Sequence, residues 1–356
     1  MTAKGTYATY YVLEMANATI ARGAAGSVPE GGRYGAPRRD LLIRVAKLYF
    51  HEGLSQGEIA RRIGVSRSNV SKMLQACKER RIVEIRIDET SSTGVRLENE
   101  LRSRLKLSPL TIVPSFSDPE QTKLQLGRAA ARLLEAGLKD GLRLGISWGS
   151  SLFHVVEAFC PPRLYRVDVV QLMGGLGARN LSMDGTNLAY RLCGKLNGEC
   201  HVIQAPLVVR NRSVRDSLLA EPDIRRTLQL AAAVDIALVG IGSSYPEASA
   251  LVRSGHLSRE QSAGLQRRGA VGNILGQQLD VAGRLCAVPL NERIVGLHPE
   301  KLKKIPLVVG VAAGALKAEA ILGAVRGGYI NALVTDEAAG QGILERLREA
   351  SPRRGE

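Results

Sequence analysis

The strongest constraint on the fold begins near residue 110, where short apolar runs alternate with amphipathic stretches of helical length. Strands in which almost every residue is apolar are typical of a parallel sheet buried on both faces, with helical crossovers between the strands. The sequence therefore predicts an α/β fold, with a Rossmann-like parallel sheet over residues 109–350. The expected strands are residues 111–113, 142–146, 167–172, 201–203, 235–241, 306–312 and 330–335.

Residues 38–90 carry the pattern of a winged helix-turn-helix. Ser55 is followed three residues later by Glu58, which is the spacing of a capping box at the start of a helix. Gly64 can adopt the left-handed conformation that ends a helix, and Ser66 can cap the next one. Two helices joined by such a turn are the core of a DNA-binding helix-turn-helix.

The second of these helices, expected over residues 67–81, has an apolar face and a polar, basic face. Polar side chains near the start of such a helix contact base edges and phosphates when the helix enters a major groove. Residues 82–87 alternate with period two, as a wing strand would. The residues expected to contact DNA are Ser55, Gln56, Ser66, Arg67, Ser68, Asn69, Ser71, Lys72 and Gln75. The alternative is a three-helix surface module whose charges are merely solvated.

The charge of the chain favours a polyanionic partner. The formal net charge is +15, and residues 38–86 contain twelve Lys or Arg against five Asp or Glu, a local excess of +7. Such a concentrated excess is typical of a nucleic-acid-binding unit. We therefore expect double-stranded operator DNA as a partner.

The remaining segments contain few motifs that indicate a function. Residues 1–37 are rich in Gly, Ala and Thr without a clear period, and we expect a disordered tail there. Residues 91–108 are expected to form a linker helix. The five cysteines lack a C-x-x-C pair and the histidines lack metal-ligand spacing, so we expect no metal and no cofactor. No apolar stretch approaches the ~20 residues of a membrane helix, and no signal peptide is recognisable, which favours a cytoplasmic protein without a membrane partner.

Several sequence segments, taken in their order along the chain, match the pattern of a known family. Residues 48–85 read LYFHEGLSQGEIARRIGVSRSNVSKMLQACKERRIVEI, followed by GISWG at 145–149, GNILG at 272–276 and GVAAGALKAEAI at 310–321. In this order they resemble the SorC family of sugar-responsive transcriptional regulators, over about residues 39–345. The resemblance implies an effector domain similar to sugar-phosphate isomerases and deaminases. It also implies a homo-oligomer (a tetramer or dimer) and a phosphorylated sugar or polyol as the effector that controls a catabolic operon allosterically.

One strand-turn-helix segment is suited to the phosphate of such an effector. The strand at 142–146 is followed by a turn of small residues and then by a helix, so that backbone N–H groups and the positive helix end converge. We expect contacts from Ser147, Gly149, Ser150 and Ser151. The family usually has a larger basic or polar residue at position 150 and Thr at 151, and the hydroxyls here preserve only part of that pattern.

Four further residues are effector candidates. Lys317 follows a buried strand at the edge where α/β sheets bind ligands, and it matches a lysine of the family. A lysine buried there needs an anion, so we expect Lys317 to recognise the phosphate together with Ser150 and Ser151; the alternative is a surface lysine. Asn273 stands where many relatives have an acidic residue that contacts sugar hydroxyls. Asp280 is either a hydroxyl contact or a turn-forming residue, and Gln171 is either a hydroxyl contact or a polar strand end.

Two enzymatic interpretations compete with a regulator. Residues 145–149 match the G-x-S-x-G elbow of hydrolases, for which Asp280 and His298 would have to complete a triad. A sugar-phosphate isomerase or deaminase fused to a DNA-binding head is the stronger rival. Proton transfer in such an enzyme needs positioned carboxylates or a His, whereas the candidate loops offer mainly Ser, Asn, Gly and Gln. We therefore expect no catalytic residues and no enzymatic activity.

Overall fold

The computed structural model describes residues 8–12, 39–80, 82–87, 92–177 and 183–349. The chain forms two compact units, one within residues 1–89 and the other within residues 90–356. Each unit has its own apolar core. None of the helices in these ranges is long and apolar enough to span a membrane.

The smaller unit consists of three helices and a two-stranded ribbon. The helices are α1 (Arg39–Phe50), α2 (Gln56–Ile63) and α3 (Arg67–Glu79), and strand β2 (Val83–Ile87) follows them. Strand β1 (Ala8–Val12) pairs with β2 in antiparallel register. The predicted helix-turn-helix and wing strand are thus present.

Strand β1 corrects one expectation, because it lies inside the segment expected to be a disordered tail. Its sequence, Ala-Thr-Tyr-Tyr-Val, is rich in the β-branched and aromatic residues that favour strands. The rest of residues 1–37, to which that expectation also applied, lies outside the described residues.

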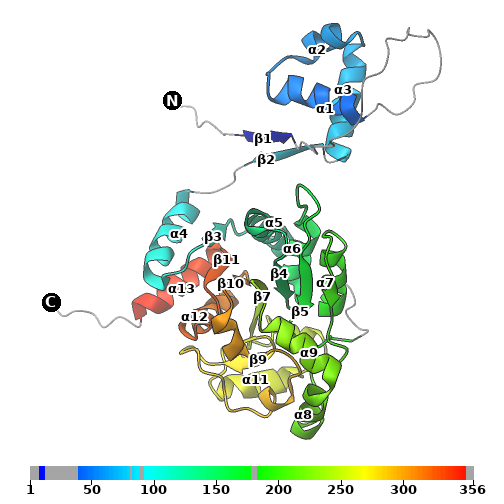
Figure 1. Cartoon of the computed structure of the whole chain (residues 1–356). Coiled ribbons are helices and arrows are strands. Elements are labelled where there is room, and N and C mark those ends of the chain that lie inside the picture. The colour runs from blue at the N-terminus through cyan, green and yellow to red at the C-terminus, as the bar shows by residue number, and fades with distance from the viewer. Residues whose placement is uncertain (1–7, 13–38, 81, 88–91, 178–182, 350–356) are drawn as a thin grey trace, which may run out of the picture. The chain divides into compact units, whose positions relative to one another are not determined.

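The larger unit is built on one nine-stranded sheet, which runs through the centre of the lower body in Figure 1. Its main path has the order β3-β11-β10-β7-β4-β5-β6, and every pair along this path is parallel. The strands are β3 (Leu110–Val113), β4 (Arg143–Ile146), β5 (Asp168–Gln171), β6 (Cys200–His201), β7 (Ile236–Ser243), β10 (Leu307–Val311) and β11 (Ala332–Asp336). Each lies on or beside one of the predicted strands, so the parallel α/β architecture is confirmed.

Alternate residues of the central strands belong to two different cores. In β7, Ile236 and Leu238 pack into one core, whereas Ala237 and Val239 pack into the other. Successive residues of a strand point to opposite faces of the sheet, and here both sets are apolar. A strand covered on both faces requires this pattern.

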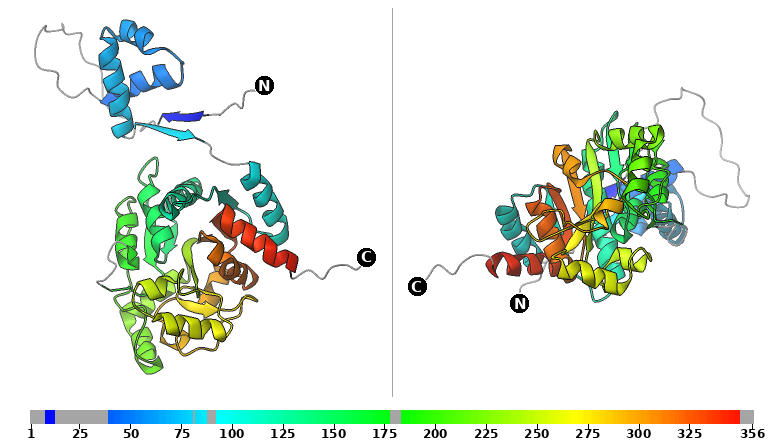
Figure 2. Two further views of the ribbon diagram at one scale, coloured as in Figure 1. Left: turned by 180° about the vertical axis from the view of Figure 1, so that it is seen from behind. Right: turned by 90° about the horizontal axis from the view of Figure 1, so that it is seen from below.

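Helices supply the second layer of each core. One core contains α5 (Pro119–Gly137), α6 (Ser150–Ala158) and α7 (Gly185–Cys193). The other contains residues from helices on the opposite face of the sheet, and Figure 2 shows the two sets from behind and from below. These are α4 (Ser92–Leu105), α9 (Pro222–Ala231), α11 (Arg259–Arg267), α12 (Ala318–Arg326) and α13 (Glu337–Glu349). The unit also contains the helices α8 (Arg212–Ala220) and α10 (Ala250–Arg253). Three short 3-10 helices follow, η2 (Asn291–Arg293), η3 (Pro299–Lys304) and η4 (Ala315–Lys317).

A short hairpin was not anticipated from the sequence. Strands β8 (Gly272–Ile274) and β9 (Gln277–Leu279) pair antiparallel, and β8 pairs antiparallel with the end of β7. Each has only three residues, which is too short for a periodic pattern. The hairpin extends β7 beyond its parallel neighbours and forms one wall of the cavity described below.

The helix expected as a linker packs on the larger unit. In α4, Leu97 and Leu101 are buried in its core, and Glu98 accepts a hydrogen bond from the Ile112 amide of β3 at 3.2 Å. Helix α4 is therefore a structural part of the larger unit and not a free connection.

This packing yields a stability prediction. Leu101 is 0% exposed, and Leu101→Ala should lower the free energy of unfolding by about 2–5 kcal/mol, the usual cost of emptying a core leucine site. The matched control is Val95→Ala in the same helix, where the side chain is 46% exposed. The control should stay within about 0.5 kcal/mol of the parent protein. Denaturant unfolding of both variants measures the difference, and equal values would show that α4 does not contribute to the core.

Candidate functional site

Both helices of the helix-turn-helix are capped by their own chain. The Ser55 hydroxyl accepts the Glu58 amide at 3.3 Å, while the Ser55 amide donates to the Glu58 carboxylate at 2.8 Å. Gly64 ends α2 with a φ of 71°, and the Ser66 hydroxyl then accepts the Asn69 amide of α3 at 3.2 Å. The predicted capping box, left-handed turn and second cap are all confirmed.

The predicted DNA contacts differ in how free their side chains are. All nine residues lie on α2, α3 or their caps, and all except the half-buried Gln56 and Asn69 are exposed. Gln75 donates to Glu79 at 3.1 Å. Arg67 and Lys72 have no hydrogen-bond or ion-pair partner within the described part of the chain. Among the nine predicted contacts, these two are the cationic side chains.

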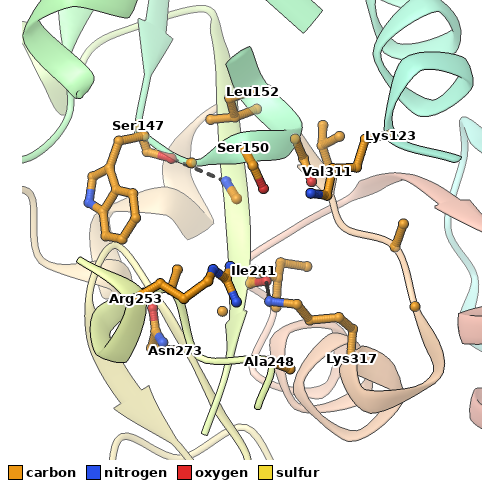
Figure 3. A pocket seen from close by; sticks show the side chains of 18 of the residues that line it. Lys123, Ser147, Ser150, Leu152, Ile241, Ala248, Arg253, Asn273, Val311 and Lys317 are labelled. Carbon is orange, nitrogen blue, oxygen red and sulfur yellow. Dashed lines mark hydrogen bonds between the residues drawn. The ribbon is translucent and has the colours of Figure 1, made fainter. Parts of the chain in front are cut away.

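The larger unit has a cavity of about 440 Å³ at the carboxyl ends of its central strands (Figure 3). Its lining comes from the ends of β4, β7 and β10 and from the segments that follow them. Parallel α/β sheets bind their ligands at this edge. Six of the eight predicted effector residues line the cavity, namely Ser147, Gly149, Ser150, Ser151, Asn273 and Lys317.

The start of α6 opens onto the cavity. Gly149 precedes this helix with a φ of 135°, a conformation that residues with a Cβ rarely adopt. No side chain of the described residues caps α6, in contrast to α2 and α3. Free N–H groups at the positive end of a helix are suited to an anion. The Ser147 hydroxyl accepts the Gly240 amide at 3.1 Å and so ties β4 to β7.

Lys317 reaches the cavity from the other side. Its Nζ donates to the carbonyl oxygen of Ile241 in β7 at 2.8 Å, and Figure 3 shows Arg253 beside it. Burial, together with the positive charges of Arg253 and Lys123, lowers the pKa of Lys317 from its usual value to about 7. Lys317 has no carboxylate partner among the described residues, so an anionic ligand would relieve this repulsion.

Asn273 lies on β8 directly over the backbone of β7. A Cβ at Gly242 would come within 2.3 Å of the Asn273 amide nitrogen, so only glycine leaves room for this side chain. Asn273 is 6% exposed, and its carboxamide makes no hydrogen bond to another described residue. A buried amide in a cavity wall is a hydrogen-bonding group for a polar ligand.

Gln171 and Asp280 lie outside the cavity lining. Gln171 is 0% exposed, donates to the Met173 carbonyl at 2.7 Å and accepts the Ile203 amide at 3.0 Å. It therefore joins β5 to the segment after β6. Asp280 accepts the amide of Arg284 at 2.9 Å and pairs with its guanidinium at 2.8 Å, closing a turn. Of the two alternatives considered for each residue, the structural one matches these contacts.

Several residues of the cavity wall were not predicted from the sequence, among them two cations and a tryptophan. Lys123 lies in the first turns of α5, Arg253 ends α10, and Trp148 follows Ser147. Lys123 and Arg253 follow β3 and β7, two strands whose carboxyl ends lie at this edge. The rule that identified Lys317 could therefore have identified them as well.

A second cavity, of about 420 Å³, adjoins the first and shares Lys123, Trp148 and Arg253 with it. Its wall includes Glu120 and His154, which contact each other at 3.2 Å. Glu120 also pairs with Lys123 at 2.6 Å, and these bonds lower the pKa of the Glu120 carboxyl. The two cavities thus meet at a pair of cations.

A buried carboxylate holds one wall of the main cavity in place. Asp336, at the end of β11, accepts the amide of Gly314 at 2.8 Å and the amide of Ala339 at 3.2 Å. Ser115 donates to its second oxygen at 2.7 Å. Asp336 therefore fixes the loop that leads from β10 to Lys317.

The described residues do not form the catalytic triad that the hydrolase interpretation requires. The Ser147 hydroxyl is bonded to Gly240, and neither Asp280 nor His298 lines the cavity. Among the described residues, no three His, Cys, Asp or Glu side chains gather as a metal site would require.

Comparison with known proteins agrees with both units. Residues 90–345 match the sugar-binding domain family (Sugar-bind), and residues 48–91 match the MarR family. The chain is 33% identical over 317 residues to the transcriptional regulator LsrR of Escherichia coli K12, covering 87% of this chain and 96% of LsrR. LsrR of Enterobacter sp. strain 638 is 32% identical over 312 residues, covering 86% and 93% respectively.

A solved structure extends the likeness to the whole fold. The full-length sorbitol operon regulator SorC of Klebsiella pneumoniae superposes with a TM-score of 0.74 at 27% identity, covering 87% of this chain and 100% of SorC. The chain belongs to this family of sugar-binding transcriptional regulators. The resemblance inferred from the ordered sequence segments is confirmed, and the regulator combines a helix-turn-helix with a sugar-binding domain.

The free cations of α3 give a prediction for DNA. Arg67→Ala and Lys72→Ala should each weaken operator binding by ~1–3 kcal/mol if they contact bases, with a flatter sequence preference. A phosphate contact would instead weaken all sequences equally and reduce the salt dependence. Arg62→Ala is the control, because Arg62 is already paired with Glu52 at 3.1 Å. Binding titrations that leave both α3 variants equal to Arg62→Ala would reject α3 as the recognition helix.

Proposed function

We propose that this regulator binds operator DNA through α3 and responds to a phosphorylated sugar or polyol held in the main cavity. The observation that supports the ligand class best is the uncapped start of α6, which faces the cavity together with three cationic side chains. A phosphate dianion would bind the free amides of α6 and be attracted by the positive charge of the cavity.

The cavity offers different groups to the two ends of such a ligand. Figure 3 shows Lys123 on the same side as Ser150, at the start of α6, whereas Lys317 and Arg253 lie together on the other side. We assign the phosphate to Gly149, Ser150, Ser151 and Lys123. The sugar hydroxyls then face Asn273, Arg253 and Lys317.

We further propose that the domain senses its ligand without converting it. The carboxylate in the main cavity wall, Glu247, is paired with Arg259 at 2.9 Å. An isomerase or deaminase would need a free base near the sugar carbons. The closest rival group is the Glu120–His154 pair of the second cavity, and incubation with sugar phosphates followed by product analysis tests that alternative.

Control of DNA binding follows from linkage between the two units. In our proposal the larger units associate into a dimer or tetramer in the cytoplasm and place paired heads on operator half-sites. A ligand that prefers one arrangement of the oligomer changes the spacing of the heads and thereby the operator affinity.

The assignment predicts a strong preference for phosphorylated ligands. A charged hydrogen bond contributes ~1.5–3 kcal/mol, so a free sugar should bind at least tenfold more weakly than its phosphate. Lys123→Met should remove much of this difference, and Lys317→Ala should lower the ligand response while leaving ligand-free DNA binding nearly unchanged. Lys139→Met, at an exposed lysine just beyond α5, is the control. Calorimetry with paired pentoses, hexoses and their phosphates measures the preference. Equal affinities for the pairs would place the phosphate elsewhere.

Lys317 adds a pH-dependent prediction. Its pKa of about 7 leaves the amine mostly neutral at pH 8, whereas a bound dianion favours the charged form and raises that pKa. Binding of inorganic phosphate or a polyol phosphate at pH 8 should therefore take up protons from the solution. Titrations in two buffers of different ionisation enthalpy count these protons. The uptake should disappear in Lys317→Met, and its persistence there would assign the proton to another group.

A further inference from the structure

Among the cations that line the main cavity, Lys123 already has an anionic partner. Its Nζ pairs with the carboxylate of Glu120, one helical turn earlier in α5, at 2.6 Å. Lys317 and Arg253, on the other side of the cavity in Figure 3, have no carboxylate partner within the described part of the chain. The fold therefore balances the charge of one cavity cation with a carboxylate of its own.

Glu120 is held beside Lys123 as a charged group. It lies in the first turn of α5, where the positive end of the helix dipole favours a carboxylate. Its second oxygen contacts Nε2 of His154 in α6 at 3.2 Å. The hydrogen bond from Lys123 and, to a smaller extent, the contact with His154 lower the pKa of the Glu120 carboxyl, so the side chain is ionised at neutral pH.

The two cavities place Lys123 between this carboxylate and the proposed phosphate. Glu120 and His154 line the second cavity but not the main one, whereas Lys123 lines both. An ammonium group has three N–H donors, so Lys123 can bond Glu120 on one side and a ligand on the other. A phosphate bound to Lys123 therefore lies close to a second negative charge.

We propose that Glu120 is an internal counter-ion that sets the affinity and the charge selectivity of the effector site. It neutralises part of the charge of Lys123 and repels the ligand phosphate, so the effector binds more weakly than the cavity cations alone would allow. The inference rests on the proposed function, because the phosphate has to bind beside Lys123.

The effect of Glu120 depends on the charge of the ligand. Coulomb energy is proportional to charge, so the carboxylate disfavours a dianion twice as strongly as a monoanion of the same shape, and it leaves a neutral sugar unaffected. Inorganic phosphate makes only the phosphate contacts, and the repulsion lowers its occupancy of the site. An effector then needs its hydroxyl contacts in addition to its phosphate.

The test compares the full-length protein with its Glu120→Gln variant. The amide oxygen of glutamine can still accept the hydrogen bond from Lys123, so the substitution removes the charge and keeps the shape. Two probes share a three-carbon polyol at pH 8, where glycerol 3-phosphate is a dianion and 2,3-dihydroxypropane-1-sulfonate is a monoanion. Trp148, the only tryptophan of the chain, lines both cavities, so its fluorescence reports binding, and calorimetry provides a second measurement.

The expected gains in affinity follow the charges of the probes. At low ionic strength, Glu120→Gln should bind glycerol 3-phosphate about fivefold more tightly than the parent protein does, and the sulfonate about twofold more tightly. In 1 M salt, where the Debye length is about 3 Å, both gains should become small. Glu300→Gln is the matched control, because Glu300 pairs with Lys303 at the same sequence spacing, at 2.7 Å, and lines neither cavity. It should leave both affinities unchanged.

The outcomes separate the counter-ion from the phosphate site. If Glu120→Gln binds glycerol 3-phosphate no more tightly than the parent protein does, the counter-ion is rejected while the proposed function stands. Equal gains for the two probes, or gains that salt does not reduce, would show that the substitution changes the shape of the site, and they also overturn the proposal. If glycerol 3-phosphate does not bind the parent protein, the phosphate site of the proposed function fails and the counter-ion fails with it.

Discussion

Strand β7 is the element on which the effector domain depends. It pairs in parallel with β10 on one side and β4 on the other, and its two faces supply both apolar cores. Its carboxyl end continues past these neighbours to pair with β8. This end of β7 provides the Gly240–Gly242 floor of the cavity and the Ile241 carbonyl that accepts a hydrogen bond from Lys317. The register of one central strand thereby aligns groups from four segments that are far apart in the sequence.

Without a ligand, the buried positive charges around this floor lower the stability of the fold. Burial lowers the pKa of Lys317 to about 7, below that of the unfolded chain, so folding disfavours its charged form. The unfolded chain therefore binds more protons between pH 7 and the usual lysine pKa, and stability from this group rises with pH across that window. An anion in the cavity reverses the effect by favouring the charged form. Folding stability and ligand binding are thus linked through the same side chain.

Much of the architecture could be predicted because its signals are local or periodic. The apolar strand segments predicted the parallel sheet, and Ser55, Gly64 and Ser66 predicted the helix-turn-helix. The three-residue strands β8 and β9 are too short to show a period, and they form only because the end of β7 offers a partner. In the cavity, Lys123 and Arg253 were missed because each lies 10 residues beyond the end of its strand, against 6 for Lys317, and so farther from the strand ends that were searched. Gln171 and Asp280 were named because polar residues at strand ends and turns look alike, whether they bind ligands or hold the backbone.

The helix starts of the two units show how the chain separates structural from binding roles. In the head, the Ser55 and Ser66 hydroxyls accept hydrogen bonds from amides in the first turns of α2 and α3, so these helix starts are stabilised without DNA. In the effector domain, Gly149 takes the position of the cap before α6 and offers no side chain to its amides. A cap contributes typically about 1 kcal/mol, and a chain that omits it beside a cationic cavity leaves that stabilisation for a ligand to supply. In our proposal, such a helix start is structural where a side chain caps it, as in α2 and α3, and binds the effector phosphate at α6.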